Sequence, residues 1–331
     1  MSAVAECLSK VHLGDPQTHH NLSLYPLLGD GVAEPAYLLL DEALKRGCAR
    51  VTEVSESGSV PELCFVNDCD RPVLLLDGEE LVGAKQNRIL NLSVLAPAHK
   101  SIVIPVSCVE AGRWHAQSAE FASAGRAHYA SGRAEKVAQV SASLHSAGSR
   151  RSDQGQVWDH ISAKSERMAA HSPTGAAAAL YETHRSGLDD YRNAFAAVAA
   201  QLGALFLLNG EVIGLDLFDC ARTLSTLLPK LVESAALDAI DAGQDSAQGD
   251  GQVVAQRFLD AIAQAEVERF QAIGEGEDLR LCHQAVTGGA LVAEERVVHL
   301  CAFPIHADEG NGNRREGSRL VRTSQRRRGR P

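Results

Sequence analysis

The stretch GALFLLNGEVIGLDLF, residues 203–218, consists of two apolar runs separated by Asn209-Gly210. Asn-Gly between apolar runs is a strong signal for a two-residue hairpin, because both central residues of a type I′ turn need positive φ. A second stretch, GALVAEERVVHLCAF at residues 289–303, shares the opening Gly-Ala-Leu and the Val, Leu and Phe of the returning run. The two stretches predict two related β-hairpins, although unrelated apolar hairpins can also share this much by chance.

The remainder of the chain indicates an α+β fold. Between residues 60 and 112, short apolar runs alternate with Pro, Gly and Asp turns, which is typical of an antiparallel sheet or sandwich. Within this region Asp77-Gly78 predicts another hairpin turn. Helical spacing then predicts helices over 120–147, 153–170, 174–199, 221–240 and 252–273, with a kink or break at Pro229. Strands and helices gathered in separate parts of a chain favour the α+β class.

The same patterns predict the organisation of the chain. We expect a poorly ordered leader (1–20), a β-rich part (21–114), a helical part (115–200), an α+β part with the repeated hairpins (201–304) and a disordered tail (305–331). Residues 21–304 are expected to form one composite domain. The tail carries eight arginines against three carboxylates and no hydrophobic pattern, so weak nucleic-acid contacts are the most we expect of it.

Composition limits the class of protein. Apolar residues make up 45% and charged residues 22%, which is ordinary for a globular chain. There is no secretory leader pattern and no apolar run near the roughly 20 residues of a membrane helix, so we expect a cytoplasmic protein without a membrane partner. The eight cysteines show no metal-ligand spacing. We expect no metal site and mostly reduced thiols, with a Cys64–Cys69 pair as the alternative.

Basic residues concentrate in the middle of an acidic chain. Residues 83–152 hold nine Lys or Arg against three Glu, whereas the whole chain has a net charge of −10. This imbalance indicates a local anion-binding surface. Solvated helix faces are the alternative explanation.

A first polar cluster lies in LLLDGEELVGAKQNRIL, residues 74–90. Its members are Glu79, Glu80, Lys85, Gln86, Asn87 and Arg88. Lysine supplies a point charge, arginine a bidentate fork and the amides orienting donors and acceptors, a set that suits a phosphate, carboxylate or ribose. A charged edge strand that resists aggregation has a similar composition.

A second cluster is SCVEAGRW, residues 107–114, at the end of a predicted strand. Trp114 could stack on a base or cap the core. Glu110 could form a carboxylate pair with Glu79 or Glu80 for acid–base chemistry or cation binding. Cys108 has no identifiable base beside it, so we interpret it as a buried thiol.

A third cluster, SRRSDQ at residues 149–154, precedes a predicted helix. Asp153 in the first turn is ordinary capping chemistry. Arg150 and Arg151 beside a helix N-terminus would equally suit an anion.

These residues lie in strings that resemble a known family, the ADP-ribosylglycohydrolase- and rhodanese-phosphatase-superfamily-associated protein domain. The strings are RPVLLLDGEELVGAKQNRILNLSVL, IPVSCVEAGRW, GSRRSDQGQVWD, SPTGA, GALFLLNGEVIGLDLFD and DLRLCHQAVTGGALVAEERVVHLCAF, and they run from about Leu22 to Phe303. The resemblance implies, by association, a link to ADP-ribose-like compounds. It also implies a shared pocket made of Glu79, Glu80, Lys85, Gln86, Asn87, Arg88, Glu110, Arg113, Trp114, Asp153 and Gln154.

Three functions remain open from the sequence. The first is a binding module for an anionic nucleotide-type ligand, with Lys85, Arg88 and Arg113 holding charge, Gln86 and Asn87 fixing orientation, and Trp114 stacking. Glu79, Arg151, Asp153 and Gln154 are further candidates for ligand binding. The second is a hydrolase or transferase on the same ligand class, with Glu80 and Glu110 as acid and base or as metal ligands. The third is a protein partner of ADP-ribose-processing enzymes. No cofactor is indicated.

Overall fold

A computed structural model describes residues 2–243 and 249–305 of the chain. The expected tail from residue 306 onward and residues 244–248 lie outside the described residues. The described chain mixes helices with antiparallel sheets, so the predicted α+β class is confirmed.

The larger sheet has nine antiparallel strands in the described chain. They are β1 (Val11–Leu13), β2 (Gln17–His19), β3 (Leu22–Gly29), β13 (Gln201–Leu208), β14 (Glu211–Phe218), β15 (Glu266–Gln271), β16 (Glu277–Cys282), β17 (Val286–Ala293) and β18 (Arg296–Pro304). Their order is β1-β3-β13-β14-β18-β17-β16-β15, with β2 paired to β3. Both repeated stretches form the predicted hairpins, β13–β14 and β17–β18. At the first turn, Asn209 and Gly210 have φ values of 50° and 87°, as the Asn-Gly signal requires.

The two hairpins meet about a local twofold axis. Their returning strands β14 and β18 are neighbours, and Asp216 pairs with Cys301. These two residues occupy the same place in the two repeated stretches. On either side of them, Leu215 pairs with Ala302 and Leu217 with Leu300. The twofold axis therefore passes between Asp216 and Cys301, and a rotation about it exchanges the two repeated stretches.

The β-rich part closes into a barrel. Its strands are β5 (Ala49–Glu53), β6 (Glu62–Asn67), β8 (Glu79–Gly83), β9 (Arg88–Leu90), β11 (Lys100–Cys108) and β12 (Phe121–Ala127), in the order β11-β6-β5-β12-β8-β9. Three short strands, β4 (Leu38–Leu39), β7 (Val73–Leu75) and β10 (Val94–Ala96), form a separate small sheet. We expected an antiparallel sheet or sandwich here, and the strands do pair antiparallel, but they close into a barrel. Closure removes exposed strand edges, which a composition pattern alone does not reveal.

The hairpin predicted at Asp77-Gly78 is wrong. Strands β7 and β8 flank this turn but belong to different sheets, and of the two turn residues only Gly78 has positive φ, at 79°. Asp77 is 1% exposed and accepts hydrogen bonds from Arg133 and Lys136. The aspartate is therefore a buried charge acceptor at the junction of two sheets, and not a solvent-facing turn residue.

Eight helices complete the described chain. They are α1 (Ala3–Leu8), α2 (Leu40–Lys45), α3 (Ala130–Ala147), α4 (Gln154–Arg167), α5 (Ala178–Thr183), α6 (Arg185–Ala194), α7 (Ala221–Ala242) and α8 (Gly251–Gln264). Helix α7 continues through Pro229 without the expected break.

Several expected boundaries differ from the structure. The helix expected over 174–199 is two helices, α5 and α6, and the helix expected from residue 120 begins at Ala130. The part expected to be helical from residue 115 contains strand β12, whose FASAGRA sequence has weak strand propensity but pairs with β8. The helix expected over 252–273 ends at Gln264 and is followed by β15. The first twenty residues, expected to be poorly ordered, contain α1, β1 and β2, because Val4 and Leu8 are buried and β1 and β2 pair with β3.

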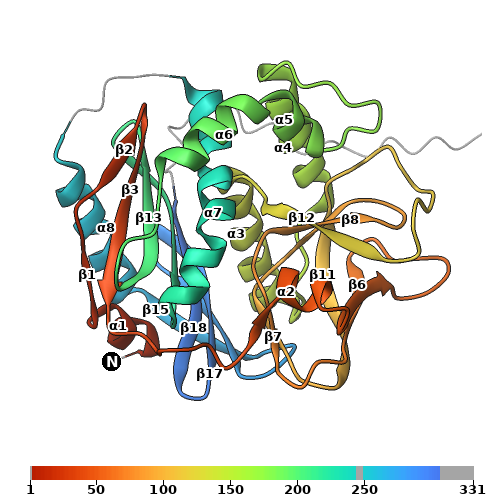
Figure 1. Cartoon of the computed structure of the whole chain (residues 1–331), viewed down its shortest axis with the longest axis horizontal. Coiled ribbons are helices and arrows are strands. Elements are labelled where there is room, and N and C mark those ends of the chain that lie inside the picture. The colour runs from red at the N-terminus through yellow and green to blue at the C-terminus, as the bar shows by residue number, and fades with distance from the viewer. Residues whose placement is uncertain (1, 244–248, 306–331) are drawn as a thin grey trace, which may run out of the picture.

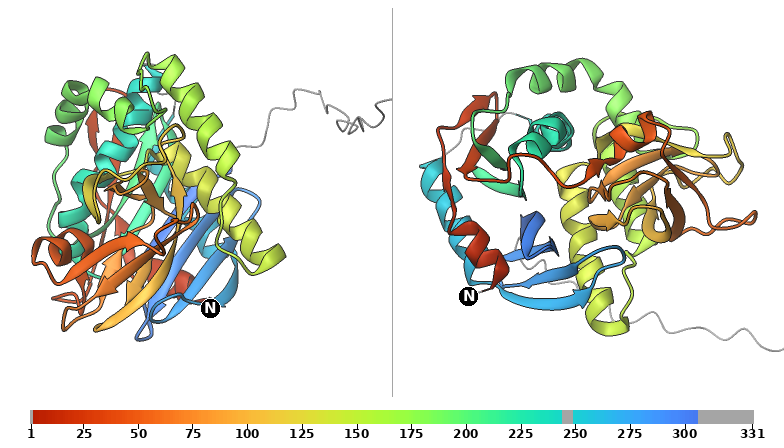
Figure 2. Two further views of the ribbon diagram at one scale, coloured as in Figure 1. Left: turned by 90° about the vertical axis from the view of Figure 1, so that its right-hand side faces the viewer. Right: turned by 60° about the horizontal axis from the view of Figure 1, so that its bottom comes forward.

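Helices α3 and α7 lie between the large sheet and the barrel (Figures 1 and 2). One apolar core joins the three layers, with Phe206 from the sheet, Leu231 from α7 and Ile89 from the barrel among its members. A second core packs α1 and α8 on the other face of the sheet. Between the large sheet and the barrel, Arg133 of α3 donates hydrogen bonds to Asp77 at the barrel side and to Asp216 in the sheet.

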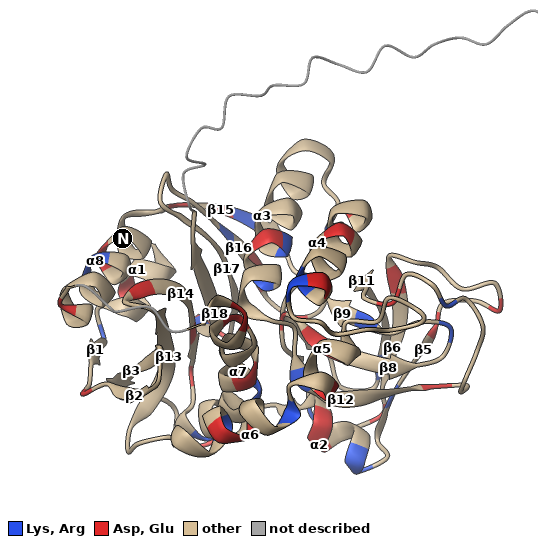
Figure 3. Ribbon diagram, turned by 90° about the horizontal axis from the view of Figure 1, so that it is seen from above, with Lys and Arg blue, Asp and Glu red and all other residues tan. Residues whose placement is uncertain are grey.

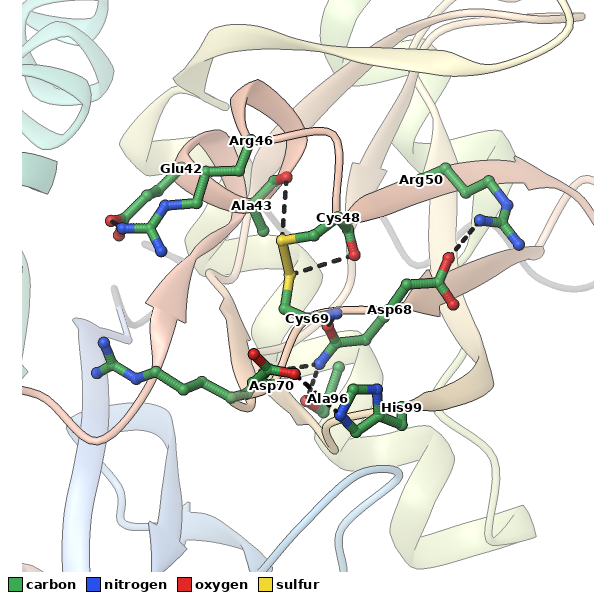
Figure 4. The surroundings of a disulfide bond; sticks show 12 residues. Glu42, Ala43, Arg46, Cys48, Arg50, Asp68, Cys69, Asp70, Ala96 and His99 are labelled. Carbon is green, nitrogen blue, oxygen red and sulfur yellow. Dashed lines mark hydrogen bonds and ion pairs between the residues drawn. A yellow bond between two sulfur atoms is a disulfide. The ribbon is translucent and has the colours of Figure 1, made fainter.

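A disulfide joins Cys48 and Cys69, which flank the paired strands β5 and β6 (Figure 4). Their Cα atoms lie 4.9 Å apart, brought together by the antiparallel register of the two strands. The alternative pair, Cys64 with Cys69, is therefore wrong, because Cys64 is a free thiol within β6. The other six cysteines are free, as we expected for most of them.

Candidate functional site

Arg88 and Cys108 lie at one end of the barrel and face its interior. Arg88 begins β9 and pairs with Cys108 of β11 and with Leu81 of β8. Directly paired residues on neighbouring strands point to the same side. Leu81 belongs to the barrel's apolar core, as does Leu90, two residues beyond Arg88 on the same strand. A guanidinium and a thiol therefore occupy positions at which the rest of the barrel has aliphatic side chains.

The Arg88 guanidinium is buried and only partly bonded. Its Nη1 donates to the Gln86 side-chain oxygen at 2.9 Å, and the side chain is fully buried. Its Nε and Nη2 are also buried, and neither has a hydrogen-bond partner among the described residues. Burial lowers the pKa of Arg88, while the neighbouring Cys108 and Glu53 oppose that effect. The side chain thus retains a charge and two unused donors in a water-poor position.

Those two donors form the edge with which arginine binds an oxyanion. Nε–H and Nη2–H point in parallel and match the two oxygens of a carboxylate or phosphate. Arg126 uses this edge to hold Glu80 at 2.6 and 3.0 Å. Arg113 uses it on one oxygen of Glu110, at 2.9 and 2.7 Å. Of these three well-buried arginines, only Arg88 has this edge unpaired within the described chain.

Trp114, Lys85 and Glu53 surround Arg88. The Trp114 ring centroid lies 5.7 Å from the Arg88 guanidinium carbon and 5.4 Å from Lys85 Nζ, yet the residue remains 47% exposed. Glu53 ends β5 at the same end of the barrel, and its Oε1 accepts from the Lys85 backbone N–H. Its Oε2 is buried without a partner in the described residues. We call Glu53, Lys85, Gln86, Arg88, Cys108 and Trp114 the barrel-mouth site.

Glu110 and Arg113 support the loop that carries this site. Arg113 donates to the Ala84 carbonyl at 2.7 Å and to the Asn87 side-chain oxygen at 3.0 Å. Glu110 accepts from the Asn87 backbone N–H at 3.1 Å and from Thr174 at 2.8 Å. Although burial opposes ionisation, Arg113, Thr174 and Asn87 hold the pKa of Glu110 below its ordinary value. The pair therefore fixes the shape of the 84–88 loop.

The thiol of Cys108 is buried, as predicted from the sequence. It lies 3.2 Å from the Gln86 side-chain oxygen. Burial raises the pKa of Cys108, although the charge of Arg88 acts in the opposite direction. The neutral thiol therefore leaves the positive charge of Arg88 uncompensated.

The residues of the third predicted cluster, 149–154, do not all reach the barrel-mouth site. Gln154 reaches the site, since its side chain exchanges two 2.8 Å hydrogen bonds with the backbone of Cys108. Asp153 instead caps α4 through the N–H groups of Gly155 and Gln156. Arg151 is exposed and lies 3.7 Å from Glu62.

Glu79 and Glu80 are held by contacts outside the barrel-mouth site. Glu79 accepts from Lys230 at 2.6 Å and from the Leu76 backbone N–H at 2.8 Å. Glu80 pairs with Ile89 across the strands, on the opposite side from Leu81, and is held by Arg126. Because strand residues alternate in direction, Glu80 and Glu110 belong to different networks, each with its own arginine. The sequence alone missed Glu53 and Arg126, which reach their places only through barrel closure.

Two searches of the described residues complete the description. No group of three or more His, Cys, Asp or Glu in them could hold a metal ion. No helix within residues 2–243 and 249–305 is long and apolar enough to cross a membrane.

The fold and the site define an α+β protein with a closed barrel and a buried arginine at its mouth. The chain belongs to the family of the ARG and Rhodanese-Phosphatase-superfamily-associated Protein domain, whose model matches residues 10–303. This match confirms the resemblance found in the sequence, and the name links the family to those two superfamilies. Comparison with curated proteins and with solved structures gives no match.

Proposed function

We propose that the barrel-mouth site binds a small anionic ligand of the nucleotide type. One observation carries the proposal: the Nε and Nη2 donors of Arg88 are buried and have no partner in the described chain. Removing an unpaired charge from water costs several kcal/mol. A bound oxyanion on that edge would offset this cost, as Glu80 does for Arg126.

The surrounding side chains suit the other parts of such a ligand. Lys85 adds a second positive charge near the oxyanion. Glu53 Oε2 can accept a hydrogen bond from a sugar hydroxyl. The exposed part of the Trp114 ring offers a surface on which a base can stack. The family's name favours ADP-ribose as the first compound to test.

The same geometry does not favour the predicted acid–base pair of Glu80 and Glu110. A general acid or base needs a carboxylate that can exchange a proton with the ligand. Glu110 is engaged by Arg113, Thr174 and Asn87, and Glu80 by both donors of Arg126. Neither carboxylate has the free oxygen that the hydrolase or transferase hypothesis requires.

The test is binding measured by calorimetry and by thermal unfolding. ADP-ribose, AMP, ribose 5-phosphate and inorganic phosphate should include at least one compound that raises the unfolding temperature of the full chain. Arg88→Lys keeps a positive charge but loses the fork, so it should weaken binding about tenfold or more. Trp114→Ala should weaken AMP more than phosphate.

Arg151→Ala is the matched control, because this exposed arginine lies outside the site. It should bind as the native chain does. Absence of binding by all four compounds, or unchanged affinity in Arg88→Lys, would refute the proposal. Turnover of a bound compound, abolished in Glu110→Gln while binding survives, would establish the enzyme instead.

A further inference from the structure

A second polar pocket lies outside the barrel, where β12 meets α5, α6 and α7. Its volume is about 290 Å³. The polar side chains lining it are Arg126, Tyr181, Arg185, Asp189, Arg192 and Glu233, and we call it the α6–α7 pocket. Residues of both charge signs gather in this part of the molecule (Figure 3). A small organic molecule fits such a volume, which is near the lower limit for ligand pockets.

Arg126 is held rigidly at the wall of this pocket. Its Nε and Nη2 bind Glu80, and its guanidinium lies 4.5 Å from the centroid of the Tyr181 ring. Although burial opposes the charge, Glu80 keeps the pKa of Arg126 above its ordinary value. Nη1 makes no hydrogen bond within the described residues and is the remaining donor. The arginine is thus oriented before any ligand arrives.

Two further charges of opposite sign have no partner in the described chain. Arg185, at the start of α6, forms no ion pair there, whereas Arg192 is paired with Asp189 at 2.6 Å. Glu233 of α7 lies only partly exposed and accepts no hydrogen bond from any described residue. Burial raises the pKa of Glu233, and the nearby Arg126 and Arg192 oppose this. The pocket therefore presents unpaired positive and negative groups on different elements.

We propose that the α6–α7 pocket binds a small zwitterion, a molecule with a carboxylate and an ammonium group a few bonds apart, such as a free α-amino acid. The carboxylate would accept from Arg126 Nη1 and Arg185, and the ammonium would donate to Glu233. A simple anion would leave Glu233 unpaired, and a simple cation would leave Arg185 unpaired and the Nη1 donor of Arg126 unused. Only a ligand with both charges pairs all three groups at once.

This inference is independent of the barrel-mouth site. Glu80 and Leu81 are successive residues of β8 and face opposite sides of the strand. Leu81 packs inside the barrel with Leu90, whereas Glu80 faces outward and orients Arg126. Each site can fail its own test without affecting the other.

The test is calorimetric titration of the full chain with glycine, the standard L-amino acids and β-alanine. Acetate and methylammonium, which carry one charge each, serve as half-ligands. At least one zwitterion should bind, and both half-ligands should bind at least about tenfold more weakly. Glu233→Gln should weaken zwitterion binding by about tenfold or more, because the ammonium loses its acceptor charge.

Glu182→Gln removes an exposed carboxylate from neighbouring α5, outside the pocket, and should leave the affinity unchanged. Glu233 has no partner in the described chain, so its neutralisation should not impair folding, and circular dichroism of the variant checks this. Absence of binding by the whole panel, equal binding of acetate, or unchanged affinity in Glu233→Gln would each overturn the proposal.

Discussion

Replacing Arg88 with methionine should make the ligand-free protein more stable. The substitution removes the hydrogen bond to Gln86 at 2.9 Å, the long one to the Asn87 carbonyl at 3.5 Å, and the contact with Trp114, together about 2 to 3 kcal/mol. It also removes a buried, incompletely paired charge, whose effective cost is several kcal/mol. In Arg88→Met, the Gln86 side-chain oxygen still accepts a hydrogen bond from the Cys108 thiol, so it is not left without a donor. We expect a net stabilisation of about 1 to 2 kcal/mol.

Arg113→Met provides the matched comparison, because Arg113 is as deeply buried but has its carboxylate partner. Its removal leaves Glu110 buried without its main positive charge and should cost about 3 to 5 kcal/mol. Urea unfolding of the dialysed proteins distinguishes the two. With an m value of about 3 kcal/mol/M, the midpoint should rise by roughly 0.5 M in Arg88→Met and fall by more than about 1 M in Arg113→Met. A loss of 1 kcal/mol or more in Arg88→Met would refute the reasoning, since it would mean that the charge is already compensated without ligand.

Three further predictions concern stability. Replacing both Cys48 and Cys69 with serine should cost about 3 kcal/mol, because the bond closes a loop between residues 21 apart, and reductant should bring the native chain to the same urea midpoint. Although burial opposes ionisation, Arg133 keeps the pKa of Asp216 below its ordinary value. The ionised carboxylate therefore stabilises the folded chain above the unfolded pKa of about 4, and this contribution is lost as pH falls toward the folded pKa. Between about pH 6 and 3, the urea midpoint should fall more steeply in the native chain than in Asp216→Asn. Gly276→Ala should cost more than about 1 kcal/mol, because φ is 89° and the new Cβ would overlap the Val292 carbonyl oxygen. Gly47→Ala, with φ of 69° and open space around it, should cost less.

Two similar turn signals had different outcomes, and burial explains the difference. Asn209-Gly210 lies at the end of a hairpin, so local φ preferences decide the turn. Asp77-Gly78 has nearly the same chemistry, but the Asp77 carboxylate is enclosed by Arg133 and Lys136 of a helix far along the chain. Those partners cannot be read from the neighbouring sequence, so a local signal predicted a hairpin where the chain crosses between sheets.

The sequence predicted those residues of the candidate site that lie on two strands paired with each other. The β9–β11 pairing places Arg88, with Gln86 just before it, beside Cys108, where β11 ends and the rest of SCVEAGRW begins. Strand alternation along residues 79–90 would put Glu80 and Arg88 on the same face. They face opposite sides because the chain turns between β8 and β9 and Arg88 pairs with Leu81. Glu53 belongs to a strand that reaches the site only when the barrel closes, so nothing in its local sequence indicated the role.

The local twofold between β14 and β18 makes the two hairpins chemically unequal. Pairing about such an axis brings the position on the axis opposite its own counterpart, so an unaltered duplicate would place two aspartates side by side there. Like charges directly opposite each other destabilise a sheet. This chain has Asp216 on one strand and Cys301 on the other, and Arg133 bonds the aspartate while also holding Asp77 beside the barrel. The two hairpins therefore differ in function although their backbones are related by the twofold. Only the 203–218 hairpin provides a carboxylate at this position, and only its side of the axis can be joined through Arg133 to the barrel.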